Sequence, residues 1–339
     1  MFISLQYVRG IAALLVVYFH AVIQLNHSGR APVDFLLLGE SGVDLFFVLS
    51  GFVMWITTYN KNISPFNFFK KRLLRVAPIY WLLTIICAAI ALVVPHLLKS
   101  TVFDVEHLIY SLLFIPHLNP AGNGDIISPV IVPGWTLNFE MFFYLVFALC
   151  LFIKPLFIRL LTVTLIMLLL FLMSFLYKGA NVVFEFYFNA IIIEFLFGVL
   201  VGVLLTNNVA ICTISRLLPL TLLFFSSLLL LFNDAFSSFP RFIALGLPAF
   251  IVIYACVLYE NNYCVPRIEI LKFMGDSSYS IYLTHIFVIA GSRVLFSQVG
   301  ITLDSINPFF YVLFCIVFSA LVGGAFYLMI EKKLSKLLN

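Results

Sequence analysis

Charged side chains are scarce in this sequence. Only 10% of its 339 residues are Asp, Glu, Lys or Arg, whereas 63% are hydrophobic and Phe alone occurs 39 times. A soluble domain carries about a quarter charged residues, so this chain has too little polar side-chain surface to cover a water-exposed core. The composition excludes an ordinary soluble domain and predicts an all-α integral membrane protein.

Other signals are also missing. The six cysteines are scattered without a CxxC pair, so we expect neither a disulfide framework nor a metal site. No long basic run is present, so no nucleic acid partner is expected. The N-terminal apolar segment lacks a basic start and a small-residue cleavage site, and we interpret it as a retained helix. Without an internal repeat or a separate soluble stretch, residues 1–339 are expected to form one domain.

Long apolar segments are abundant instead. A spanning helix needs about 20 mostly apolar residues. The chain contains about ten such segments, at 5–25, 43–60, 76–98, 134–153, 157–177, 183–205, 217–233, 241–259, 273–296 and 308–330. The segment 104–117 is apolar but short, and we expect it to be a re-entrant or interfacial helix.

The basic residues predict the orientation of these segments. If the N-terminus is cytoplasmic, fourteen of the 19 Lys and Arg residues fall on the inner side. This bias follows the positive-inside rule, and an even number of spans places both termini in the cytoplasm.

The first apolar segment carries an ionisable residue near each end. Arg9 and His20 are eleven residues apart, which on a helix is about three turns plus 20°, so both face the same way about 16 Å apart. Arg9 alone is also compatible with a membrane-surface anchor, and His20 with a hydrogen bond to a neighbouring helix. Because ionisable groups inside a membrane are costly, a functional role is the sharper hypothesis.

Three further ionisable residues fall inside other apolar segments. Asp44, Glu140 and His285 are expected at mid to outer depth, near the level of His20. Unpaired, each would cost several kcal/mol in lipid, so the pattern predicts one shared polar cavity. Two histidines and two carboxylates suit acid–base catalysis, although metal binding and proton relay remain open at this point.

The predicted inner surface has a different character. The string KKRLLRVAPIYW (70–81) brings four cations to the start of the third span, and Arg72 and Arg75 share a helix face. Guanidinium groups suit phosphate, but a patch that binds anionic lipid has the same composition. Glu194 and the pair Gly198 and Gly202 are weaker signals, and a GxxxG spacing most often marks close helix packing.

Together these motifs resemble the acyltransferase-3 family of membrane acyltransferases. The resemblance covers nearly the whole chain. It rests on Arg9 with His20, and on GVDLFFVLSGF (42–52), RLLRVAPIYW (72–81), GWTLNFE (134–140) and SYSIYLTH (278–285). The short chain, with FVMW after Ser50 and Gly51, is similar to the exopolysaccharide O-acetyltransferases of that family.

The resemblance implies transfer of an acyl group, usually acetyl, from acyl-CoA to a hydroxyl of a cell-envelope glycan or lipid-linked sugar at the bacterial inner membrane. It implies acyl-CoA binding by Arg9, Arg72 and Arg75, to which we add Lys71. His20 is then expected to act as the general base, oriented by Asp44 or Glu140. An acyl-His or acyl-Ser intermediate is equally compatible with these residues.

Two further residues are expected to contact substrate. Trp135 is expected to stack on a sugar, and His285 to bind the acceptor. Acetyl-CoA is the expected co-substrate, and no metal is expected. The leading alternative is a proton-coupled transporter or flippase of a polysaccharide precursor, which also needs buried histidines and carboxylates.

Overall fold

The computed structural model describes residues 2–27, 37–98, 101–122, 126–207 and 215–338. Across these ranges the fold is helical, with one isolated β-bridge between Leu118 and Ile127. The helices are α1 Ile3–Asn26, α2 Ser41–Thr58, α3 Pro65–Val93, α4 Val105–Leu112, α5 Trp135–Cys150, α6 Leu156–Leu176, α7 Val182–Tyr187, α8 Ile193–Thr206, α9 Leu217–Leu231, α10 Leu247–Asn262, α11 Glu269–Asp276, α12 Ser278–Gln298, α13 Pro308–Phe326 and α14 Lys332–Leu338. Short 3-10 or π turns adjoin several of them. Three residues used in the sequence predictions lie outside the described residues: Arg30 and Lys99, both expected on the outer side, and Cys212, one of the six scattered cysteines.

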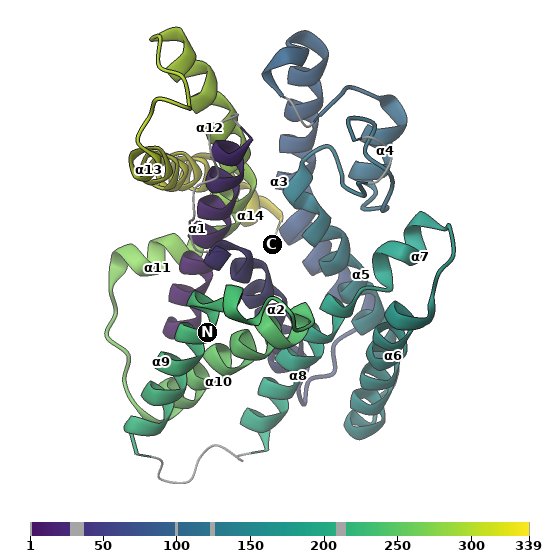
Figure 1. The fold of residues 1–339 in the computed structure, drawn as a ribbon. Coiled ribbons are helices and arrows are strands. Elements are labelled where there is room, and N and C mark those ends of the chain that lie inside the picture. The colour runs from purple at the N-terminus through teal and green to yellow at the C-terminus, as the bar shows by residue number, and fades with distance from the viewer. Residues whose placement is uncertain (1, 28–36, 99–100, 123–125, 208–214, 339) are drawn as a thin grey trace.

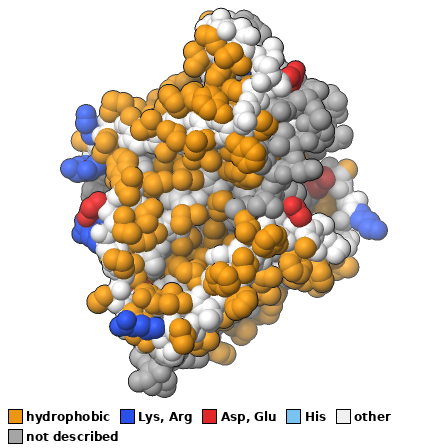
Figure 2. Space-filling model, turned by 60° about the vertical axis from the view of Figure 1, so that its left-hand side comes forward, with side chains coloured by type: hydrophobic (Ala, Val, Ile, Leu, Met, Phe, Trp, Pro, Cys, Tyr) orange, Lys and Arg blue, Asp and Glu red, His pale blue; other side chains and the backbone are white. Residues whose placement is uncertain are grey.

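Eight of the described helical segments are long and apolar enough to cross a membrane. They match eight of the expected spans, and the all-helical, multi-pass architecture is confirmed. Two shorter apolar helices, Ala190–Thr206 and Leu217–Leu231, occupy the positions of the other two. The count of ten spans and the cytoplasmic termini stay predictions. Figure 2 shows one face covered mostly by hydrophobic side chains, with most of its visible Lys and Arg side chains along one edge.

Three expected boundaries are wrong for identifiable reasons. The third span begins at Pro65 rather than 76, because Pro fits the first helical position, so the basic string lies inside α3. The segment 183–205 is broken into α7 and α8, because the side chain of Asn189 caps a new helical turn. The segment 273–296 is divided at Ser277 into α11 and α12.

Helix α1 packs against α2, α10, α11, α12 and α13 (Figure 1). Its first turn is capped from α10, where the carboxylate of Glu260 accepts hydrogen bonds from the backbone N–H groups of Ile3 and Ser4 at 2.6 and 2.7 Å. These N–H groups have no partner within their own helix, and a carboxylate also complements the positive end of the helix dipole. The cap fixes the position of α1 and hence of Arg9 and His20.

Helices α2 and α8 pack closely through glycines. A side chain on Gly198 would collide with the backbone of Val48 in α2, and one on Gly202 would meet the Trp55 ring at 2.6 Å. Gly51 in turn faces the backbone of Phe195. Small residues let helix backbones approach in this way, so the close packing predicted from the GxxxG spacing is confirmed.

Candidate active site

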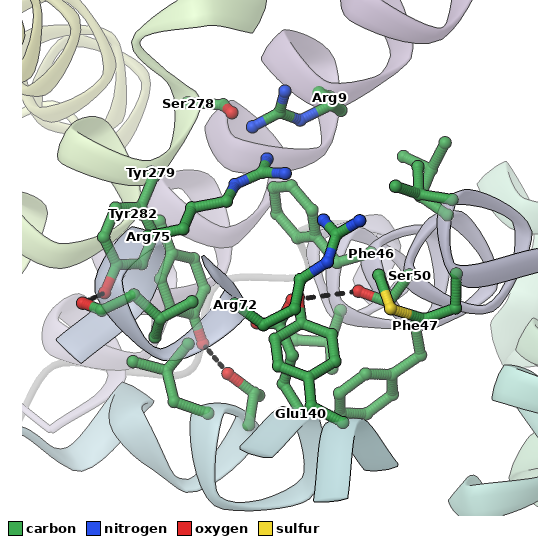
Figure 3. A pocket seen from close by; sticks show the side chains of 18 of the residues that line it. Arg9, Phe46, Phe47, Ser50, Arg72, Arg75, Glu140, Ser278, Tyr279 and Tyr282 are labelled. Carbon is green, nitrogen blue, oxygen red and sulfur yellow. Dashed lines mark hydrogen bonds between the residues drawn. The ribbon is translucent and has the colours of Figure 1, made fainter. Parts of the chain in front are cut away.

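A cavity of about 210 Å³ opens among α1, α2, α3, α5 and the α11–α12 region. Arg9, Arg72, Arg75 and Glu140, which come from three different helices, all line it. In Figure 3 the guanidinium groups of Arg9, Arg72 and Arg75 converge on this space. We call it the arginine cavity.

The three guanidinium groups make no ion pair with a described carboxylate. Arg9 donates to Gln6 Oε1 at 3.1 Å, and Arg72 donates to Thr57 Oγ1 at 3.0 Å. The Arg72 guanidinium also lies 5.5 Å from the centroid of the Phe68 ring. Three guanidinium groups without an ion pair to a described carboxylate suit an anionic ligand.

The acids that line the arginine cavity have partners of their own. Glu140 accepts hydrogen bonds from Ser50, at 3.0 Å, and from Tyr144. Glu331 accepts from Ser280, and Asp276 pairs with Lys272 at 2.6 Å. These carboxylates attract the guanidinium groups through space, Glu140 and Glu331 acting on Arg9 and Glu140 acting on Arg72, but none lies within ion-pair distance of them.

The two histidines of the predicted site form a pair. The rings of His20 and His285 lie 4.9 Å apart between centroids. His20 Nδ1 lies 2.9 Å from the Val16 carbonyl, and His285 Nδ1 lies 2.5 Å from the Tyr282 carbonyl. Since a carbonyl only accepts, each neutral ring carries its hydrogen on Nδ1 and keeps a basic lone pair on Nε2. His285 Nε2 is buried and has no partner within the described chain.

The histidine pair lies outside the arginine cavity, and Tyr282 stands between them. Tyr282 lines the cavity, and its ring centroid lies 6.0 Å from that of His285. Its hydroxyl donates to the Pro133 carbonyl at 2.6 Å and bonds Thr136 at 2.7 Å. Phe46 packs edge-on against Tyr282, with 5.9 Å between centroids, and lines the same cavity. These two rings therefore separate the arginine cavity from the histidine pair.

The expectation of one cavity at one depth is wrong. Gly42 approaches Ala12 and Val16 of α1, while Gly39 approaches Leu15 and Phe19. In this antiparallel register, Asp44 lies beside the part of α1 that is roughly 10 Å from His20 toward the N-terminus of the helix. Glu140 lies deeper still, in the cavity with Arg9.

Asp44 and Glu140 have partners other than the imidazoles. Asp44 is fully buried and accepts from Arg241 at 2.8 and 3.2 Å, while Arg241 also pairs with Glu40 at 3.0 Å. Glu194 is also fully buried, and it interacts with Asp44 and with Arg241. Neither Asp44 nor Glu140 orients His20 in this structure, because the Val16 carbonyl does so.

Two further predicted residues lie near the arginine cavity but not in its wall. Trp135 is half-buried and packs edge-on against Phe47 and Phe139, with centroids 6.4 and 6.0 Å away. Lys71 lines a second cavity beside the first. No group of three or more His, Cys, Asp or Glu residues that suits a metal occurs within the described ranges.

Sequence reasoning missed several residues of the cavity wall. Ser278, Tyr279 and Tyr282 line the cavity and belong to the SYSIYLTH motif. The helical spacing of Ser278 and Tyr282 from His285 puts these two on the same side of the helix as His285, one to two turns nearer its N-terminus. Tyr144 follows Glu140 by one turn, which was a usable signal. Glu331 gave no signal, because it comes from a distant helical turn near the C-terminus.

These features define a multi-pass membrane protein with an arginine-lined cavity next to a histidine pair. Residues 2–328 match the acyltransferase domain family known as acyltransferase-3, and the chain belongs to this family. It is 33% identical over 320 residues to the exopolysaccharide production protein ExoZ of Rhizobium meliloti (strain 1021), covering 91% of this chain and 94% of that protein. It is also 32% identical over 152 residues to the acyltransferase MdmB of Streptomyces mycarofaciens, covering 43% of this chain and 38% of that protein. No solved structure matches the chain.

Proposed function

We propose that this acyltransferase moves an acetyl group from acetyl-CoA to a hydroxyl of a cell-envelope polysaccharide or its lipid-linked precursor. The observation that carries the proposal is the set of three guanidinium groups that open into one cavity without an ion pair to a described carboxylate. CoA is a polyanion with a long uncharged arm, which suits such a cavity. The name of the relative from Rhizobium meliloti supports an exopolysaccharide acceptor, and the bacterial inner membrane is the proposed location.

The positions of the arginines and histidines support an order in which the parts of the donor bind along the molecule. The phosphates of the donor bind Arg9, Arg72 and Arg75, and the pantetheine arm extends past Phe46 and Tyr282 toward His20. Arg9 and His20 lie on one face of α1 about 16 Å apart, a span that suits this extended arm. The thioester then lies beside the two imidazoles.

The proposed proton transfer rests on the tautomers of His20 and His285, which each keep a lone pair on Nε2. His20 Nε2 takes the proton of the acceptor hydroxyl, and the resulting alkoxide attacks the thioester carbonyl carbon. The carbon–sulfur bond breaks, and the imidazolium returns the proton to the leaving thiolate. His285 Nε2 accepts a hydrogen bond from the acceptor and so positions it. The sugar-stacking role of Trp135 stays a prediction.

A direct test compares membranes that carry the wild-type chain with membranes that carry Arg72→Ala/Arg75→Ala. We expect radiolabelled acetyl transfer from acetyl-CoA in the wild type, with acetyl esters detected on the polysaccharide by mass spectrometry. We expect thermal stabilisation of the solubilised protein by CoA, and its loss in the double variant. A wild-type protein that ignores CoA but responds to a proton gradient contradicts the proposal and favours the transporter alternative.

A further inference from the structure

A second cavity of about 210 Å³ lies between α3 and the C-terminal segment that contains Glu331 and α14. It adjoins the arginine cavity, because Arg75 and Glu331 line both. Lys71 lines only the second cavity, whereas Arg9 and Arg72 line only the first. Two neighbouring cavities, each with cations, thus share one arginine.

Helical geometry explains how α3 serves both cavities. Side chains advance by about 100° per residue, so Lys71, Leu74 and Pro78 share one face of α3. Arg72 and Val76 project from a face about 150° away, into the arginine cavity. Arg75 lies at the border between the two faces, which is why it reaches both spaces.

The walls of the second cavity combine apolar and cationic groups with one carboxylate, that of Glu331, which accepts a hydrogen bond from Ser280. Leu74, Pro78, Ile79, Leu334 and Leu338 supply apolar surface from two sides. Lys71 and Arg75 supply positive charge, and Lys71 makes no ion pair with a described carboxylate. Apolar walls suit the faces of a flat aromatic base, and an ammonium group suits a phosphate monoester.

We propose that the second cavity binds the 3′-phosphoadenosine end of CoA, with Lys71 on the 3′-phosphate and the apolar walls against the adenine. This inference rests on the proposed function. CoA carries phosphate at two places on its adenosine, a 3′-monoester and a 5′-pyrophosphate. The pyrophosphate then lies in the arginine cavity, against Arg75, Arg72 and Arg9, and the pantetheine arm continues from there past Phe46 and Tyr282.

The experiment compares acetyl-CoA with acetyl-3′-dephospho-CoA, which lacks only the 3′-phosphate. A charge-assisted hydrogen bond to a phosphate is expected to give the wild type about a tenfold lower KM for acetyl-CoA. Lys71→Ala is expected to raise the KM for acetyl-CoA by this factor and to leave the KM for the dephospho compound unchanged. Lys70→Ala is the matched control, because Lys70 is the adjacent lysine and lines neither cavity.

A second variant tests the adenine position independently of charge. Leu334→Trp fills the second cavity and is expected to raise the KM for acetyl-CoA, but not that for acetyl-phosphopantetheine, which has no nucleoside. If Lys71→Ala keeps the preference for the 3′-phosphate, or if Leu334→Trp impairs both donors equally, the inference is overturned. If the wild type uses none of these donors, the proposed function itself fails.

Discussion

The rings of His20 and His285 are in contact, yet neither ring lines the cavity that gathers the arginines. The two parts of the site are joined through Tyr282, one turn before His285. A donor that binds at the arginines must therefore extend along the bundle before its thioester meets an imidazole. A long donor such as acyl-CoA fits this separation, whereas a small acyl phosphate does not.

Replacing His20 tests the proposed base. His20→Ala removes the only lone pair assigned to take the acceptor proton, and we expect acetyl transfer to fall by about 10²–10⁴-fold. Binding of CoA should persist, because the arginine cavity does not include His20. Radiolabel transfer in membranes and thermal stabilisation by CoA measure the two properties. Near wild-type transfer in a folded variant would exclude His20 as the base.

The sequence predicted where residues lie on their own helix better than it predicted which residues of different helices pair. The period of α1 placed Arg9 and His20 correctly on one helix, because helical geometry is local. Asp44 and Arg241 are 197 residues apart, and no local pattern links them. The depth of Asp44 depends on the glycine contacts between α1 and α2, so it followed only from the tertiary structure.

The pair of Asp44 and Arg241 is expected to stabilise the fold rather than the reaction. Arg241→Leu leaves the fully buried carboxylate of Asp44 without its cation, at a cost of about 3 kcal/mol. This is the lower end of the usual range, since the Arg241 side chain is 34% exposed. Thermal unfolding in detergent measures the loss, and Asp44→Leu/Arg241→Leu should recover part of it.

Activity separates this structural role from catalysis. Asp44→Asn should retain much more acetyl transfer than His20→Ala, because the Val16 carbonyl already orients the imidazole. If Asp44→Asn unfolds at the wild-type temperature but loses transfer as completely as His20→Ala, Asp44 regains the catalytic role that the sequence suggested.

Phe46 is expected to control which acyl groups reach the histidines. It packs on Tyr282, whose hydroxyl makes two hydrogen bonds that fix the position of its ring. Of the two rings, Phe46 is therefore the one that can move aside. Phe46→Ala should raise the rate with butyryl-CoA relative to acetyl-CoA by about tenfold, since pocket size discriminates methylene groups at this level. Thiol release with each donor measures the ratio. Phe142→Ala is the control, as Phe142 stacks on Tyr187 and does not line the cavity. An equal change in both variants contradicts the assignment.

A second histidine pair predicts a pH-dependent segment outside the spans. His107 Nδ1 donates to His117 Nε2 at 2.5 Å, and burial, with a smaller effect of His117, lowers the pKa of His107 to about 4. The folded segment therefore binds fewer protons than the unfolded one between pH 4 and about 6.5, so its stability is full above this window and is lost as the pH falls through it. At pH 5 we expect a loss of about 2 kcal/mol, because the added proton on His107 Nε2 is buried without an acceptor among the described residues. Hydrogen exchange of residues 105–117, corrected for intrinsic rates, measures this loss. His107→Phe should abolish the pH dependence, and an unchanged dependence in that variant would assign it to another group.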